Sequence, residues 1–179
     1  MPNQFMRVDA DYTAKPYDEW TAADWPRTYQ SPSYENVFAA GIAFAPPHAI
    51  SVPRTSPSGT VIAPAPPRAG MPSATIGKTV VRNIVDTIAG TSGPPHTASM
   101  ADMGAACVAS AGANPFTGNA ASMIVYPIVP DYDRFPEYGR DLDRTFGEIG
   151  LAGHWIKILL HHLLLYKARL RPGWSCIPE

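Results

Sequence analysis

The stretch YENVFAAGIAFAPP, residues 34–47, decides the predicted fold. Aromatic, valine and alanine residues run up to Gly41, and Ile42 and Ala43 follow before two prolines. A short run of such residues that stops at a glycine predicts a buried strand over 34–41. The bare backbone at Gly41 indicates either a turn or the close approach of another group that a side chain would obstruct.

Length, charge and cysteine usage narrow the class of protein. The chain has 179 residues, of which 45% are hydrophobic and 16% charged, which is enough for one core with an appendage. A formal net charge of -1 gives no basic face, so a nucleic-acid partner is not expected. Cys107 and Cys176 lie far apart with no Cys-x-x-Cys motif, so we expect neither a disulfide framework nor a metal site.

The N-terminal stretch MPNQFMRVDA has no basic segment followed by an apolar core, and no apolar run reaches 18 residues. We therefore expect no signal peptide and no membrane-spanning helix. A cytoplasmic location with reduced cysteines follows as the expectation.

Prolines divide the chain. There are 20 of them, and they crowd into residues 46–95 and 115–136. Because proline removes a backbone donor and breaks helices, these stretches are predicted to be ordered loops. The long Pro/Ser/Thr loop at 42–70 is predicted to wrap a ligand or a partner, since structureless loops of this length are uncommon in compact domains.

Two helices and a hairpin complete the predicted elements. SATIGKTVVRNIVDTIAG, residues 73–90, predicts a helix with Ser73 as N-cap and Gly90 at its end. Its apolar residues recur at four-residue spacing: Ile76, Val80, Ile84 and Ile88. HTASMADMGAACVASAG and NAASMIVYPIVP, separated by ANPFTGN, predict an antiparallel hairpin within 96–130.

The segment GHWIKILLHHLLLYKARLRPGW predicts a second helix over about 150–170. It combines a broad leucine-rich face with lysines, arginines and histidines, so it suits either a membrane interface or the core of a domain. His154, His161 and His162 fall within a narrow arc, but no acidic or cysteine partner accompanies them, so no metal role is predicted. The predicted fold class is α/β, in the form of an α+β fragment.

Five segments, in this order and rough spacing, resemble sulfide:quinone oxidoreductases, a branch of the disulfide-reductase-like FAD-dependent flavoproteins. NVFAAGIAFAPP resembles the stretch that closes their FAD domain, and Pro67-Arg68-Ala69-Gly70 falls where they have Pro-Lys-Thr-Gly. IGKTVVRNI is similar to the helix that follows, and SMADMG to their Cys-x-Ala-Asp-x-Gly strand. GHWIKILLHHLLLYKARL is similar to their C-terminal membrane-attached helix.

The resemblance implies a fold and a cofactor. Residues 1–95 would be the closing part of a two-dinucleotide-fold FAD domain with its proline-rich loop. Residues 96–179 would be a β-hairpin region with a C-terminal membrane-interface or interaction helix. The residues implied to face FAD, by backbone N–H groups or by positive charge, are Gly41, Ile42, Arg68 and Gly70.

The resemblance also implies electron transfer from a reduced donor through FAD to quinone by a peripheral membrane protein. The implied quinone pocket consists of Met100, Trp155 and Tyr166. Ser99 stands where the family has a redox cysteine, and a serine forms neither a disulfide nor a persulfide, so no catalytic residue is assigned and the donor stays open.

The chain departs from the family in a second way, because it has no G-x-G-x-x-G fingerprint. The phosphate-binding half of the FAD site would then belong to an N-terminal partner chain, and the isolated chain would be an inactive, oligomer-forming part of an oxidoreductase. A non-catalytic structural or interaction subunit derived from this family is the alternative. A globular domain unrelated to flavoproteins is a third possibility.

Overall fold

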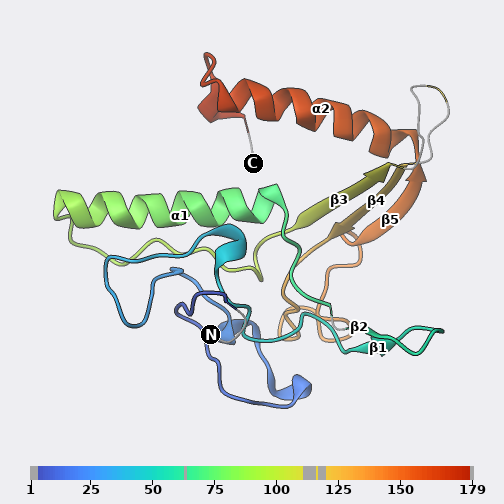
Figure 1. Cartoon of the computed structure of the whole chain (residues 1–179), viewed down its shortest axis with the longest axis horizontal. Helices are drawn as coiled ribbons and strands as arrows, with labels where there is room; N and C mark the ends of the chain where they lie inside the picture. Colours follow the sequence, from blue (N-terminus) through green and yellow to red (C-terminus); the bar gives the residue numbers. More distant parts are fainter. Residues whose placement is uncertain (1–3, 63, 111–115, 117–119, 178–179) are drawn as a thin grey trace. The chain divides into compact units, whose positions relative to one another are not determined.

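The computed structural model describes residues 4–62, 64–110, 116 and 120–177. The fold is mixed, with two helices and two small antiparallel sheets (Figure 1). The chain forms two compact units. The first contains 1–105 and 126–142, and the second contains 106–125 and 143–179. These units describe packing, and the division into 1–95 and 96–179 stays a prediction about the parts of a larger enzyme.

Helix α1, Gly70–Ala89, is the longest element of the first unit. It ends as predicted, because Gly90 adopts the left-handed conformation with φ +66° and closes the last turn. The start differs from the prediction: Ala69, not Ser73, is the N-cap, and the Ser73 hydroxyl donates to the Ala69 carbonyl at 2.8 Å. Pro72 is compatible with this early start, because it lies in the first turn, where a missing N–H costs no hydrogen bond.

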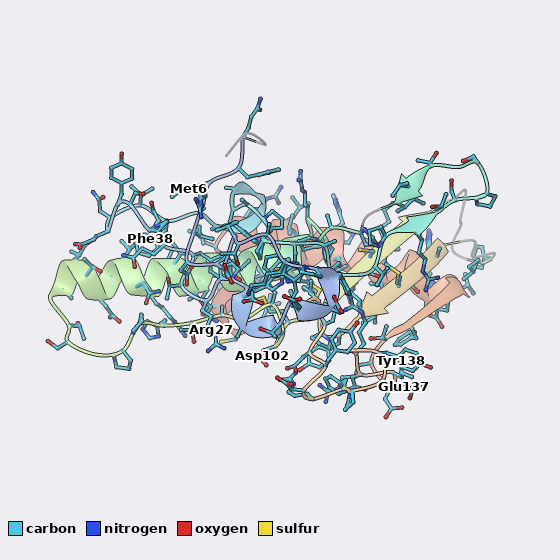
Figure 2. The ribbon with its side chains drawn as sticks, turned by 90° about the horizontal axis from the view of Figure 1, so that it is seen from below. Met6, Arg27, Phe38, Asp102, Glu137 and Tyr138 are labelled. Carbon is cyan, nitrogen blue, oxygen red and sulfur yellow. The ribbon has the colours of Figure 1, made fainter. Side chains whose placement is uncertain are left out.

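The predicted strand over 34–41 is wrong. In this segment Phe38 makes only an isolated antiparallel bridge with Gln30, and residues Gly41–Ala43 form a 3-10 turn, η3. A strand exists only where a neighbour supplies a ladder of hydrogen bonds. One more isolated bridge joins Met6 to Phe44 in parallel (Figure 2 labels Met6 and Phe38).

Two short 3-10 turns, η1 (Tyr17–Glu19) and η2 (Ala22–Asp24), shape the N-terminal segment. The proline-rich loop carries strands β1 (Arg54–Thr55) and β2 (Val61–Ile62), which pair antiparallel and are exposed. The core of the first unit gathers side chains from the N-terminal segment, the residues just after η3, α1 and the segments that follow it. Its largest fully buried members are Trp25, Tyr29, Ile76, Met100, Ile128 and Val8.

Arg140 ties the returning segment 126–142 into the first unit. Its half-buried guanidinium donates to the carbonyls of Ile50 and Ile128, each at 3.1 Å, and to that of Pro127. Burial lowers the pKa of Arg140. Because these carbonyls come from segments far apart in sequence, one side chain holds the proline-rich loop against the returning segment.

The second unit is a three-stranded sheet with a helix. Its strands are β3 (Ala105–Ser110), β4 (Ala120–Val125) and β5 (Phe146–Gly150), in the order β3-β4-β5. The adjacency of β3 and β4 confirms the predicted hairpin, whereas β5 was not predicted. Strand β5 pairs antiparallel with β4 and leads directly into helix α2, Leu151–Ala168, which confirms the predicted second helix. A last 3-10 turn, η4, covers Trp174–Cys176.

Helix α2 contacts the sheet at its start. Gly153 is its one buried residue, and a Cβ there would lie 3.1 Å from the Cβ and 3.2 Å from the carbonyl oxygen of Ala120. Most of its large apolar side chains are exposed by 38% or more: Leu151, Trp155, Ile156, Leu159, Leu160, Leu164 and Leu165. Among the described helices, none combines the length and the apolar character that crossing a membrane requires.

Candidate functional site

Gly41 lies against the N-terminal end of α1. Gly41 has φ +62°, a conformation in which side chains are strained. A Cβ at this position would lie 3.0 Å from the Ser73 hydroxyl oxygen. Gly41 is therefore required both for the turn and for the close approach of the first turn of α1.

A small pocket opens at this contact and collects residues from distant parts of the sequence. Its walls include Gly41 from η3, Phe44 just after η3, Arg68 from the proline-rich loop, Ser73 from α1, and Met100. Three of these residues, Gly41, Arg68 and Met100, were predicted as site residues from separate segments. The cavity holds about 30 Å³, the share of one water molecule, so these residues form a wall rather than an enclosed site.

The polar character of this wall comes from the backbone and from one cation. Gly70 is the first residue of α1, and no acidic side chain lies in the first turn, so the positive end of the helix dipole is not neutralised within it. Ile42 lies in the middle of η3, next to Gly41. Arg68 is exposed, and its guanidinium carbon stands 4.6 Å from the centre of the Phe5 ring. Such a wall suits an anionic or electron-rich group.

Ser99 and Met100 lie in a turn before β3, not in the strand that the resemblance implied. The Ser99 hydroxyl accepts the N–H of Ala101 at 3.1 Å, and its carbonyl accepts the N–H of Asp102 at 3.0 Å. Arg134 fixes the turn by donating to the Asp102 carboxylate at 2.7 Å. Met100 is 2% exposed, so it contributes packing to the pocket while Ser99 serves the turn.

Trp155 and Tyr166 lie on α2 in the second unit. Trp155 is 51% exposed, with the ring of His154 edge-on at 5.6 Å between ring centres. The Tyr166 hydroxyl donates to the Pro172 carbonyl at 2.7 Å, which ties the helix to the residues after it. The grouping of these two residues with Met100 in a quinone pocket stays a prediction.

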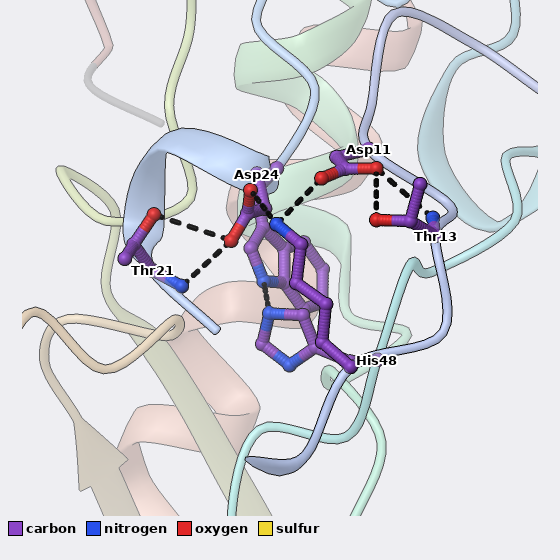
Figure 3. A network of polar contacts seen from close by, with 7 residues as sticks. Asp11, Thr13, Thr21, Asp24 and His48 are labelled. Atoms are coloured by element: carbon purple, nitrogen blue, oxygen red, sulfur yellow. Dashed lines mark hydrogen bonds and ion pairs between the residues drawn. The ribbon is translucent and has the colours of Figure 1, made fainter. Parts of the chain in front are cut away.

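Sequence reasoning missed a polar network between the N-terminal segment and the proline-rich loop (Figure 3). The Lys15 ammonium lies 2.5 Å from the Asp11 carboxylate and 2.9 Å from that of Asp24. The hydrogen bond from Lys15 lowers the pKa of Asp11. Burial opposes a similar shift at Asp24, but hydrogen bonds from Thr21 and Lys15 outweigh it and lower the pKa of that carboxylate.

His48 continues this network from the loop side. Its Nε2 accepts the indole N–H of Trp25 at 2.5 Å, and its ring stacks on Trp20 with 4.4 Å between ring centres. Burial lowers the pKa of His48. Tryptophans and acidic residues are visible in YDEW and DWPRTY, but nothing in the local sequence indicates that a histidine more than 20 residues later packs between them.

No three His, Cys, Asp or Glu side chains of the described residues come together as metal ligands. On α2, the rings of His161 and His162 stand 5.4 Å apart, and both residues are exposed. Comparisons with protein-family models, curated proteins and solved structures found no match to this chain.

Proposed function

We propose that this chain is the C-terminal part of a sulfide:quinone-oxidoreductase-like flavoprotein. It would supply one wall of an FAD site, and an N-terminal partner chain would supply the dinucleotide-binding half. The complete protein would carry electrons from a reduced donor through the flavin to a quinone at the membrane surface. One observation supports this more than any other: Gly41, Arg68 and Met100, each implied by a different matching segment, line the same pocket.

The residues of this wall fit one side of a flavin. Gly41 and Ile42 would offer backbone N–H groups, and the start of α1 at Gly70 would place the positive end of a 20-residue helix beside them. Arg68 is a permanent cation, which favours an electron-rich ring edge. A bound FAD would supply the redox chemistry, and this chain would orient it and balance its charge.

The small size of the pocket means that the partner chain would have to supply the second wall of the flavin site. A cavity of about 30 Å³ cannot enclose a three-ring system, so in this proposal the flavin would lie against the outer rim and the second wall would come from the partner chain. The isolated chain should accordingly be colourless and inactive. This outcome alone would not distinguish an incomplete enzyme from a structural subunit, so the test must use the native assembly.

The test is to purify the chain from its native cells under mild conditions, identify copurifying chains by mass, and record the visible absorption spectrum. Flavin bands together with a partner that carries G-x-G-x-x-G are the expected result. Arg68→Ala should then lower the flavin content of the assembly and Arg68→Lys should preserve it. Arg54→Ala, in exposed β1, is the matched control. A colourless assembly whose partners lack that fingerprint would contradict the proposal.

The second candidate is a non-catalytic interaction subunit derived from the same family. The turn at Ser99 favours it, because the hydroxyl at the redox-cysteine position is used within the turn and Met100 beside it is buried. A colourless protein in a stable complex with other chains would support this second function.

A further inference from the structure

Helix α1 has two apolar faces, and its own unit covers only one of them. The covered face includes Ile76 and Val80, which are 1% and 7% exposed. The other face, here called the outer seam, consists of Gly70, Ala74, Gly77, Val81, Ile84 and Ile88. Its three large members are 57%, 37% and 81% exposed, respectively.

The outer seam has the spacing of a helix-pairing surface. Its members follow one another in alternating steps of four and three residues along the whole helix. This is the heptad spacing with which one helix packs along another. On the covered face, by contrast, Ile76 and Val80 are separated by a step of four residues. The occupant that fits the outer seam is therefore one α-helix lying nearly parallel or antiparallel to α1.

The order of side-chain sizes identifies the occupant. The first half of the seam is small, with Gly70, Ala74 and Gly77, and the second half is β-branched. When a second α1 is laid antiparallel, each small residue faces a large one. Three kinds of layer result, each occurring twice in the symmetric pair: Gly70 opposite Ile88, Ala74 opposite Ile84, and Gly77 opposite Val81. A parallel pair would instead set glycine against glycine and leave gaps.

From this match we propose that the chain forms a two-fold symmetric homodimer through antiparallel pairing of the outer seams of two α1 helices. The symmetry axis passes at the level of Thr79. In each layer a β-branched side chain of one copy fills the space above a small residue of the other, as an isologous interface requires. The dimer does not rest on the proposed flavin function, although Gly70 at the start of α1 belongs to both surfaces.

The glycines of the seam support a neighbour. Glycine in a helix interior is unfavourable relative to alanine, because it leaves more backbone freedom in the unfolded chain. A Cβ at Gly77 would have no atom of the chain within 4 Å outside the helix's own backbone, and the same holds at Gly70. Nothing within the unit requires glycine at these two positions. In the dimer, Val81 and Ile88 of the second copy would require it, because they would occupy the space of a side chain.

Area and charge set the expected strength. From residue 70 to residue 88 the seam extends about 27 Å at 1.5 Å per residue. One helix face on each copy gives an interface on the order of 1,000 Å² in total, the lower limit for a specific interface, so weak association is expected. Lys78 flanks the seam beside the axis and would approach its copy in the dimer. Added salt should therefore strengthen the association by screening this repulsion.

The test is sedimentation equilibrium of the full chain over micromolar concentrations, with circular dichroism to confirm helix content. Gly77→Val has room in the monomer but would collide with the opposing Val81, so the dissociation constant should rise at least tenfold. Val81→Gly should weaken the dimer by leaving a gap. The double variant Gly77→Val with Val81→Gly exchanges the two members of a layer and should restore the dimer to within a few-fold of the original.

A control variant on α2 distinguishes association through α1 from association through α2. Leu164→Ser removes a side chain that is 69% exposed on α2 and should leave the dimer unchanged. A chain that stays monomeric until another protein is added would overturn the proposal. The same conclusion follows if Gly77→Val leaves the dimer intact, if the exchanged layer fails to restore it, or if Leu164→Ser dissociates it.

Discussion

The indole N–H of Trp25 donates to Nε2 of His48 at 2.5 Å, and Nδ1 of the same ring stands 2.5 Å from the Ala49 carbonyl oxygen. This pair of bonds fixes the neutral ring with its proton on Nδ1, because Nε2 must accept and Nδ1 must donate. A second proton on Nε2 would displace the Trp25 bond. Burial disfavours the charged ring as well, and the bond to the Ala49 carbonyl and the nearby Asp24 offset this only in part.

The first prediction concerns acid stability. Because the folded pKa of His48 lies below its usual 6.5, the unfolded chain takes up this proton first as the pH falls. The contribution of His48 to the free energy of unfolding should be complete above pH 6.5 and decline as the pH falls from there toward the folded pKa. Urea unfolding at a series of pH values measures it, and His48→Gln should remove this part of the pH dependence.

A titration followed by NMR gives an independent readout of the same contact. The ring signal of His48 should titrate below 6.5, and Trp25→Phe should raise that pKa because Nε2 then has no donor to displace. A His48 pKa at or above 6.5 in the native chain would contradict the prediction.

The second prediction concerns Gly41. Alanine at φ +62° costs roughly 1 kcal/mol, and its Cβ would crowd a Ser73 hydroxyl already held by the Ala69 carbonyl. We expect Gly41→Ala to lower the free energy of unfolding by about 2 kcal/mol in urea titrations. Adding Ser73→Ala should recover only the part due to crowding. Gly93→Ala, where no atom lies within 4 Å and the backbone is not left-handed, should change little, and an equal loss there would contradict the explanation.

The third prediction concerns the carboxylate of Asp9, which gathers three successive backbone N–H groups. It accepts those of Arg27 at 3.0 Å, Thr28 at 2.7 Å and Tyr29 at 2.6 Å. Tyr29 is fully buried and has φ +60°, so this carboxylate fixes a turn that the phenol ring needs. Asp9→Asn should lower the free energy of unfolding by about 2 kcal/mol, because an amide offers one acceptor oxygen where the carboxylate offers two.

The control for Asp9 is Asp133→Asn, at an exposed aspartate of the same unit. It should shift the urea midpoint little, since most surface substitutions do. If the two variants lost the same stability, the cause would be net charge rather than the three bonds.

The sequence allowed the helices to be predicted well, because their signals are local. Gly90 ends α1 where expected, and the helix predicted over about 150–170 is α2. The four-residue spacing within α1 also carried information that the prediction did not use. Each step of four residues turns the helix by about 40° beyond a full circle, so a run that begins buried at Ile76 reaches the exposed side by Ile88.

The features that were predicted wrongly or not at all have a common physical cause. Each depends on contacts with residues distant in sequence. The segment 34–41 has the composition of a strand, but among the described residues its pairing with the segment around Gln30 stops at a single bridge, at Phe38. His48 was not singled out, because its neighbours Trp20 and Trp25 come from another segment. That Gly41, Arg68 and Met100 line one pocket is likewise invisible to composition and periodicity, and their roles at a flavin stay a prediction that comes from the resemblance.

The last prediction concerns the second unit, where helix α2 packs on strand β4. At Gly153 an alanine would gain helix propensity of up to about 1 kcal/mol, but its Cβ would stand 3.1 Å from the Cβ and 3.2 Å from the carbonyl oxygen of Ala120. Ala120 is fully buried in a paired strand and cannot rotate away, so the overpacking cost of roughly 1–3 kcal/mol should exceed the gain. Thermal unfolding should show a lower midpoint for Gly153→Ala. Gly150→Ala has extended backbone and open space and serves as the control with no loss. A Gly153→Ala variant at least as stable as the original would contradict this close packing of α2 on β4.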